Sequence, residues 1–277
     1  IAARKINKMN PDLVVFRYWL PFMGPALGSI ARLLKKSIKT IAITDNVIPH
    51  EKRPGDTVLS KYFTGSCDGF ITLSNSVRDE LKTLVSKPIT YFPHPINDNL
   101  GEKVGKETAR EYLQLEKGVK YVLFFGIVRK YKGLDLLLKA LAKENLDSLN
   151  IKLLVVGEFY TDPEPYYEMI RDLDLDDKVV VVNEFVPTKD IKYYFSAADL
   201  VAQTYHTASQ SGISQIAYNF DSPMLVTNVG ALSEMIPHGK VGYVVEKDPG
   251  EIAEAIQDFY SNNREDEFIE NIKEEKK

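Results

Sequence analysis

Short apolar runs alternate with longer amphipathic stretches along almost the whole chain. Ten runs are predicted to be β-strands, at 13–16, 40–44, 69–73, 89–92, 121–125, 151–156, 178–182, 200–203, 224–227 and 243–246. Many of them are continuously apolar, as expected for strands that are covered on both faces. The stretches between them have apolar residues at three- and four-residue spacing, for example Leu134, Leu137, Leu138 and Leu141. This alternation predicts an α/β fold with parallel sheets.

Turn and linker chemistry marks a boundary within the segment 93–105, where Pro93 and Pro95 precede a charged stretch. A strong buried strand then restarts the pattern at Tyr121. We therefore predict two Rossmann-like domains, 1–97 and 98–277. The first has about four predicted strands, whereas a doubly wound sheet usually has about six, and it has no Gly-rich first turn. We expect this first domain to lack its opening strands.

The composition is typical of a soluble globular protein, with 44% hydrophobic and 27% charged residues. The 35 Lys and Arg residues against 39 Asp and Glu residues give a net charge of −4, which argues against a nucleic-acid partner bound through overall positive charge. A single cysteine, Cys67, excludes an internal disulfide framework. The four histidines, His50, His94, His206 and His238, show no metal-binding spacing, so we predict no metal.

A short basic loop follows the predicted strand 121–125. That strand ends at Gly126, the loop holds Arg129 and Lys132, and a helix is predicted to begin near Gly133. A strand end that opens on a helix N-terminus is where α/β proteins bind anions. Arg and Lys both suit phosphate oxygens. The pattern favours a phosphate site and a solvated basic loop about equally.

A cluster of small hydroxylated residues follows the predicted strand 200–203. It contains Ser209, Ser211 and Gly212, and an apolar helix comes after it. Hydroxyls and backbone N–H groups at a helix start suit a diphosphate. An ordinary helix cap explains one serine but not the whole cluster.

Together, these motifs resemble the nucleotide-binding domain of GT-B glycosyltransferases. They are most similar to glycosyltransferase family 4, the retaining group 1 enzymes that use nucleotide-diphosphate sugars. The matching segments are 126–133, 155–158, 185–187, 197–200 and 223–230 with Glu234, and in the first domain 45–51, 74–77 and 93–95. The resemblance is densest over roughly 121–260. It implies a GT-B fold, in which two Rossmann-like domains face a cleft.

The resemblance also implies roles by position. Arg129 and Lys132 match the basic pair on the donor diphosphate and, with Asp45, form the predicted catalytic set. The predicted donor-binding residues are Gly126, Glu158, Phe185, Val186, Ser209, Gln210, Ser211, Gly212 and Gln215. The predicted acceptor-side residues are Asn46 and His50, although an ordering role for His50 is favoured over catalysis. The donor would be a UDP- or GDP-sugar. Its sugar would be transferred with retention of the anomeric configuration and without a cofactor.

The sequence departs from the family pattern in both domains. Many members carry two glutamates eight positions apart, where Ala208 and Ile216 stand here. Gln210 or Gln215 would replace them by hydrogen bonding. Asp45 stands where the family often has a histidine that would contact the transferred sugar. These departures leave the donor open.

We predict a bacterial, cytoplasmic glycosyltransferase of cell-surface polysaccharide or glycolipid assembly, with a glycan or lipid-linked acceptor. One alternative is a GT-B-like sugar epimerase, which would need acid/base carboxylates and histidines in the cleft. The other is a non-catalytic nucleotide-sugar-binding protein, which Asp45, the missing glutamates and the incomplete first domain favour.

The segment 17–36 raises the question of membrane contact. It is rich in apolar residues and ends in Lys35 and Lys36. A basic amphipathic helix of this kind can rest on an anionic membrane, here at the inner face, to reach a lipid-linked acceptor. A core helix that covers the first sheet is favoured over this peripheral contact.

Overall fold

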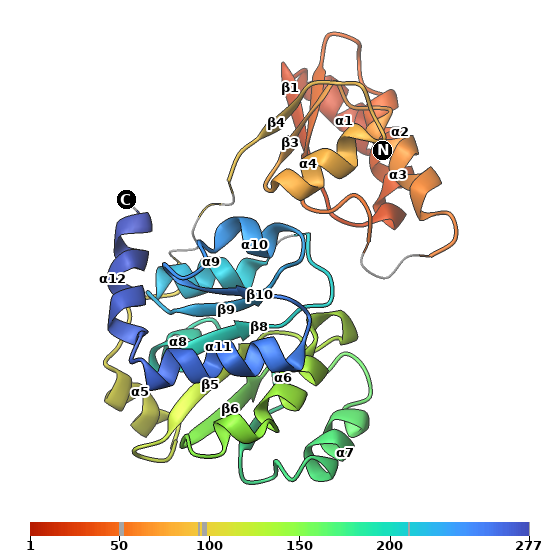
Figure 1. Cartoon of the computed structure of the whole chain (residues 1–277). Coiled ribbons are helices and arrows are strands. Elements are labelled where there is room, and N and C mark those ends of the chain that lie inside the picture. The colour runs from red at the N-terminus through yellow and green to blue at the C-terminus, as the bar shows by residue number, and fades with distance from the viewer. Residues whose placement is uncertain (50–52, 94, 96–98, 210, 277) are drawn as a thin grey trace. The chain divides into compact units, whose positions relative to one another are not determined.

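The computed structural model describes residues 1–49, 53–93, 95, 99–209 and 211–276. The chain divides into two compact units, Ile1–His94 and Pro95–Lys277 (Figure 1). The point of division falls within the segment 93–105, where the sequence has turn and linker chemistry.

The first unit is built on a four-stranded parallel sheet of order β1-β2-β3-β4. Its strands are β1 (Leu13–Tyr18), β2 (Lys39–Thr44), β3 (Gly69–Thr72) and β4 (Ile89–Tyr91). Its helices are α1 (Ala2–Met9), η1 (Pro21–Met23), α2 (Gly24–Arg32), α3 (Asp56–Thr64) and α4 (Asn75–Lys82). Each strand reaches the next through a helix, as parallel neighbours require.

One face of this sheet carries the core of the first unit. Phe16 of β1, Ala42 of β2 and Phe70 of β3 lie side by side in register and are buried. Tyr18 stacks on Phe63 of α3 with ring centroids 4.5 Å apart. Helix α2 also approaches α3 closely. The approach is possible because Gly24 has no side chain, and none would fit between it and the α3 backbone.

The second unit is built on a six-stranded parallel sheet of order β10-β9-β8-β5-β6-β7. Its strands are β5 (Lys120–Phe125), β6 (Ile151–Val156), β7 (Val179–Val182), β8 (Leu200–Gln203), β9 (Met224–Thr227) and β10 (Gly242–Val245). Its helices are α5 (Lys106–Tyr112), η2 (Lys130–Lys132), α6 (Leu134–Leu141), η3 (Glu144–Leu146), α7 (Glu164–Asp172), α8 (Ile191–Ala197), α9 (Gly212–Asn219), α10 (Ala231–Met235), α11 (Pro249–Ser261) and α12 (Glu265–Glu275).

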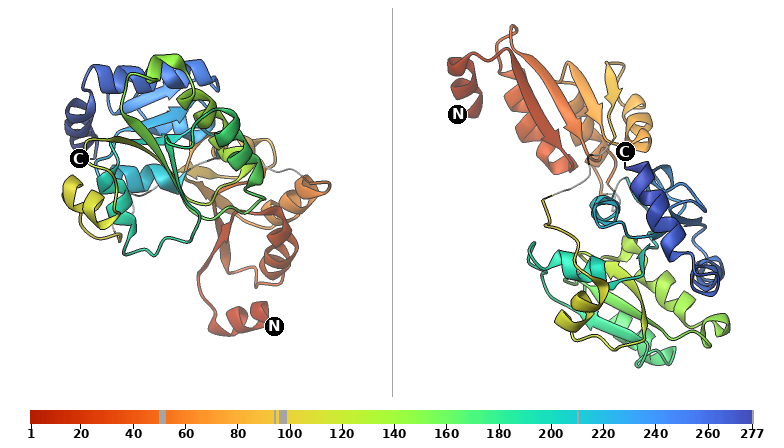
Figure 2. Two further views of the ribbon diagram at one scale, coloured as in Figure 1. Left: turned by 90° about the horizontal axis from the view of Figure 1, so that it is seen from below. Right: turned by 90° about the vertical axis from the view of Figure 1, so that its left-hand side faces the viewer.

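The strand order of the second unit is that of a doubly wound sheet. The first strand of this sheet in the sequence is the central strand β5. The chain then runs outward through β6 and β7 and returns to β8 on the other side of β5. Helices lie on both faces of the sheet (Figure 2), with α6 and α11 in one core cluster and α8 and α9 in the other. The order reverses between β5 and β8, and ligands of such sheets bind at the carboxyl ends of the strands there.

All ten predicted strands are present, and each agrees with the structure to within two residues at either end. The prediction of an α/β fold with parallel sheets is therefore confirmed.

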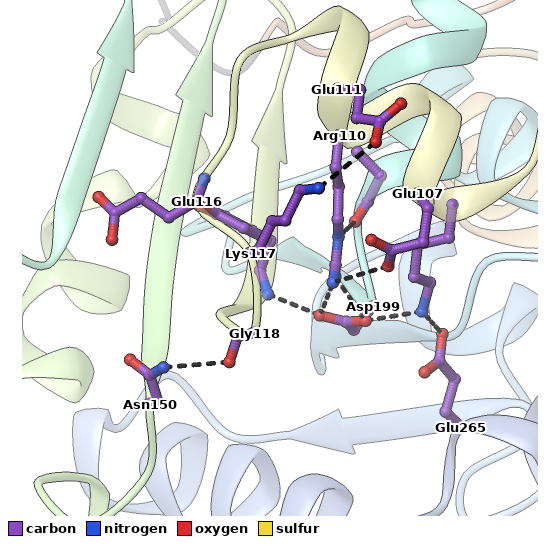
Figure 3. Close-up of polar contacts among 12 residues, drawn as sticks. Glu107, Arg110, Glu111, Glu116, Lys117, Gly118, Asn150, Asp199 and Glu265 are labelled. Carbon is purple, nitrogen blue, oxygen red and sulfur yellow. Dashed lines mark hydrogen bonds and ion pairs between the residues drawn. The ribbon is translucent and has the colours of Figure 1, made fainter.

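A buried ion-pair network lies at the opposite, amino edge of the second sheet (Figure 3). Arg110 of α5 donates from Nη2 to both carboxylate oxygens of Asp199, each at 3.0 Å. Lys106 lies 2.6 Å from the same carboxylate and also pairs with Glu265 of α12. The Tyr121 N–H donates to Asp199 at 2.6 Å. The network fastens α5 and α12 to the starts of β5 and β8.

Candidate functional site

The chain leaves β5 at Gly126, close to two other parts of the site. A Cβ added there would lie 3.2 Å from Nζ of Lys132 and 3.3 Å from Cδ1 of Ile213 in the first turn of α9. The structure therefore brings together the end of β5, the basic loop after it and the beginning of α9, as expected at the switch point of the sheet.

Lys132 is a buried cation that has no counter-charge among the residues the structure describes. Its residue is only 9% exposed, and burial lowers the pKa of its ammonium. The ammonium lies 5.6 Å from the ring centroid of Tyr205. Within the described part of the chain, it has neither an ion pair nor a hydrogen bond. A desolvated, unpaired charge is costly, so this position favours an anionic ligand.

Arg129 belongs to the same loop and is half-buried. Its guanidinium carbon lies 5.2 Å from the ring centroid of Tyr160. The loop is held to the loop after β6 by its backbone: Val128 N–H donates to the Glu158 carbonyl at 2.8 Å, and Tyr160 N–H donates to the Val128 carbonyl at 3.2 Å. The structure thus places Glu158 beside the basic loop through its main chain.

The loops after β5 and β8 are joined directly. The Thr204 hydroxyl donates to the Gly133 carbonyl at 2.8 Å, and a Cβ on Gly133 would lie 1.9 Å from the Thr204 carbonyl oxygen. His206 N–H donates to the Tyr131 carbonyl at 2.7 Å, and its Nε2 lies 2.9 Å from Oδ1 of Asp135. No sequence pattern points to His206, because its partner is 71 residues away.

The hydroxylated cluster forms the start of α9. Ser211 caps the helix by accepting from the Ile213 N–H at 3.2 Å. Ser209 and Ser211 are buried, whereas Gly212 is exposed and has open space around it. Burial raises the pKa of Tyr205 to about 12, and a hydrogen bond with Ser211 opposes this shift. Gln210 lies outside the described residues.

Three predicted donor-binding residues lie outside the loops that follow β5 and β8. Phe185 is 71% exposed and Val186 is half-buried in the loop after β7, two strands from β5. Gln215 is buried, and its Nε2 donates to the Met235 sulfur at 3.7 Å, so it packs α9 against α10.

The predicted residues of the first unit lie at the carboxyl end of β2. Asp45 accepts two hydrogen bonds from Arg17, at 2.7 and 3.1 Å, and this contact raises the pKa of the Arg17 guanidinium. The side-chain amide oxygen of Asn46 is buried and has no hydrogen-bond partner among the described residues, and the same holds for the hydroxyls of Thr44 and Thr72. His50 lies outside the described residues.

Membrane-spanning helices and metal-binding clusters are both absent from the described residues. None of their helices is both long and apolar enough to cross a bilayer. They also contain no group of three or more His, Cys, Asp or Glu residues that would hold a metal ion.

Comparison with known proteins adds a family and a set of relatives. Residues 105–275 match the protein family described as glycosyl transferases group 1. A D-inositol 3-phosphate glycosyltransferase of Pseudarthrobacter chlorophenolicus is 28% identical over 141 residues, which cover 50% of this chain and 33% of that protein. Among curated relatives of this kind, the matched part spans 32% to 63% of their length.

Solved structures share the fold over nearly the whole chain. Sucrose-phosphate synthase from Thermosynechococcus elongatus has a TM-score of 0.83 at 19% identity, over 98% of this chain and 70% of that one. The Anabaena protein HepE in complex with UDP-glucose has a TM-score of 0.82 at 16% identity, over 99% of this chain and 76% of that one. At these identities, the likeness concerns the fold.

Proposed function

The chain belongs to the glycosyl transferases group 1 family, and from this premise we propose that it transfers a sugar from a nucleotide-diphosphate sugar to a glycan or lipid-linked acceptor. We further propose that the transfer retains the anomeric configuration and needs no metal. The UDP-glucose bound by the related HepE fold supports a nucleotide sugar as the donor.

The observation that carries this proposal is the buried ammonium of Lys132 at the end of β5, which has no partner within the described part of the second unit. It stands next to Gly126 and the capped start of α9, where backbone N–H groups and the helix dipole also favour an anion. Arg129 provides a second cation in the same loop, with a planar fork that suits phosphate. These groups supply what a departing nucleoside diphosphate needs, which is stabilisation of developing negative charge.

Calorimetric titration with UDP and with GDP tests the donor site. We expect the wild type to bind one of them, and we expect Arg129→Ala and Lys132→Ala to weaken that binding by about tenfold or more each. Lys130→Ala is the matched control, because Lys130 is an exposed cation of the same turn. Equal loss in the control would indicate a non-specific charge effect. Undiminished binding by both site variants would contradict the proposal.

A second candidate function is nucleotide-sugar binding without transfer. Two observations favour it: Asp45 is already engaged by Arg17, and neither Ala208 nor Ile216 supplies a carboxylate. Release of labelled sugar from the donor, with and without candidate acceptors, separates the two functions. Turnover supports the transferase, whereas tight nucleotide binding with no release under any acceptor supports the binding protein.

We place the proposed reaction in cell-surface polysaccharide or glycolipid assembly, with peripheral membrane contact through the first unit. Phe22 is 71% and Leu33 68% exposed, and Lys35 and Lys36 come after Leu34. Apolar side chains beside cations suit an anionic lipid surface. Sedimentation with anionic and with neutral vesicles tests this contact, and equal recovery with both would contradict it.

A further inference from the structure

One histidine contacts three segments of the second unit at once. His206 follows β8, and its N–H donates to the carbonyl of Tyr131 in the basic loop at 2.7 Å. Its imidazole Nε2 lies 2.9 Å from Oδ1 of Asp135 in the first turn of α6. Its own carbonyl accepts from Nζ of Lys247, after β10, at 3.4 Å. Arg129 and Lys132 lie in the basic loop on one side of this junction, Ser209 and Ser211 follow on the other, and His206 is not among the predicted site residues.

We propose that His206 is a positioning residue of the donor site. Its contact with Asp135 holds the loop that leads to Ser209 and Ser211 at a fixed place beside the loop that carries Arg129 and Lys132. The inference rests on the proposed function, because it concerns how the two halves of the proposed diphosphate site are kept together.

The position of His206 in its loop explains why its side chain matters. Upstream, Thr204 is already fixed to Gly133 by a hydrogen bond and by close backbone contact. Downstream, the backbone of Ala208 lies against Gly230 of the loop after β9. Between these two points, the imidazole of His206 provides a side-chain hydrogen bond toward α6. Its loss would remove this side-chain link to α6 from the segment that immediately precedes the hydroxylated cluster.

The chemistry of the contact does not depend on the charge of the histidine. An ionised carboxylate only accepts hydrogen bonds, so Nε2 must be the nitrogen that carries the proton toward Asp135. This holds for the neutral ring and for the imidazolium. Lys139 also approaches Asp135, at 3.9 Å, but this is an ion pair beyond hydrogen-bonding range. His206 is therefore the main hydrogen-bond donor to Asp135 among the described side chains.

Glutamine and asparagine provide a matched pair of substitutions for His206. The amide nitrogen of Gln reaches about as far as Nε2 of His, whereas that of Asn reaches only about as far as Nδ1. His206→Gln should therefore keep the hydrogen bond to Asp135, and His206→Asn should lose it, as His206→Ala does. Because Gln and Asn are chemically alike, a difference between them reports the contact itself.

The first readout is hydrogen exchange in the nucleotide-free protein, followed by mass spectrometry of peptides that cover 204–216. We expect His206→Ala and His206→Asn to speed exchange there by about tenfold, and His206→Gln to leave it near the wild-type rate. Asp147→Ala is the control, since it removes the exposed ion pair with Lys178 at the other edge of the sheet. Unchanged exchange in all variants would overturn the inference, whether or not the protein binds a nucleotide.

The second readout is the dissociation constant for UDP or GDP, set beside the urea midpoint of each variant. We expect about tenfold weaker nucleotide binding by His206→Ala and His206→Asn, and recovery in His206→Gln. A variant with faster exchange and wild-type affinity would overturn the positioning role. If the wild type binds no nucleotide while exchange responds as expected, the coupling of the loops stands and the proposed donor site fails.

Discussion

Lys132 is expected to limit the stability of the protein while it serves the proposed donor site. Its ammonium is buried and unpaired among the described residues, and burial lowers its pKa from the ordinary value of 10.5. The unfolded chain then holds this proton more tightly than the folded protein does. Replacing Lys132 by Met removes the charge and keeps most of the volume. We therefore expect a more stable protein that has lost nucleotide affinity.

The expected gain follows from the environment of the ammonium. A buried polar group without a partner costs about 1–3 kcal/mol in protein mutational data. The contact with the Tyr205 ring returns about 0.5–1 kcal/mol of this cost. Lys132→Met should thus raise the free energy of unfolding by about 1 kcal/mol at pH 7. Loss of a charge-assisted contact with a diphosphate should cost about 1.5–3 kcal/mol of binding, or about 10- to 150-fold in affinity.

Urea unfolding and calorimetry on the same samples test both effects. The lysine's destabilising contribution is fully present below its lowered folded pKa and disappears as the pH rises to 10.5. The stability difference between Lys132→Met and wild type should therefore shrink between pH 7 and 10. Lys130→Met, in the same turn but exposed, should change neither stability nor affinity by much. A Lys132→Met protein that is less stable than wild type by about 1 kcal/mol or more, the size of one hydrogen bond, would refute the reasoning.

Substitutions at three further positions have defined outcomes. Tyr160→Leu should weaken nucleotide binding severalfold because it removes the ring under Arg129, and Tyr160→Phe should not; titration of both variants measures this. Gly230→Ala should lower the melting temperature, because its Cβ would lie 1.6 Å from a carbonyl oxygen of the neighbouring loop; calorimetric melting within error of wild type would contradict the packing. Arg110→Met should cost about 3–5 kcal/mol in urea unfolding, because Asp199 stays buried with less compensation, and a loss below about 1 kcal/mol would show that Lys106 suffices.

The fold was largely predictable because its strands are uniform in character. The runs 121–125, 151–156 and 224–227 are almost continuously apolar and end at polar or glycine-containing turns, so both their type and their bounds are encoded locally. The order of the strands, in contrast, is not encoded locally. That β8 returns to lie beside β5 follows from the packing of helices on both faces, which no single segment specifies.

The candidate site was predictable in its loops but less so in its contacts. The position of Lys132 at a strand end is readable from sequence, whereas the lack of a counter-charge for it among the described residues depends on distant segments. Gln215 lies in the expected helix but donates to Met235, because the face that a helical residue presents depends on what packs against it. Asp45 follows its strand as expected, yet its partner Arg17 comes from the neighbouring strand through the sheet register.

The glycines at the switch point show why such sites are hard to read from one sequence. Gly133 lies against the backbone of Thr204, and Gly230 lies against the backbone of Ala208, so neither position has room for a side chain. Each contact joins loops that follow different strands, and the need for glycine arises only after those strands have paired. The three loops therefore pack backbone to backbone, which leaves their side chains to carry charge and hydroxyl groups toward a ligand. A buried cation that has no counter-charge among the described residues suits an anionic ligand such as a diphosphate, because the ligand then supplies the missing charge rather than displacing an existing partner.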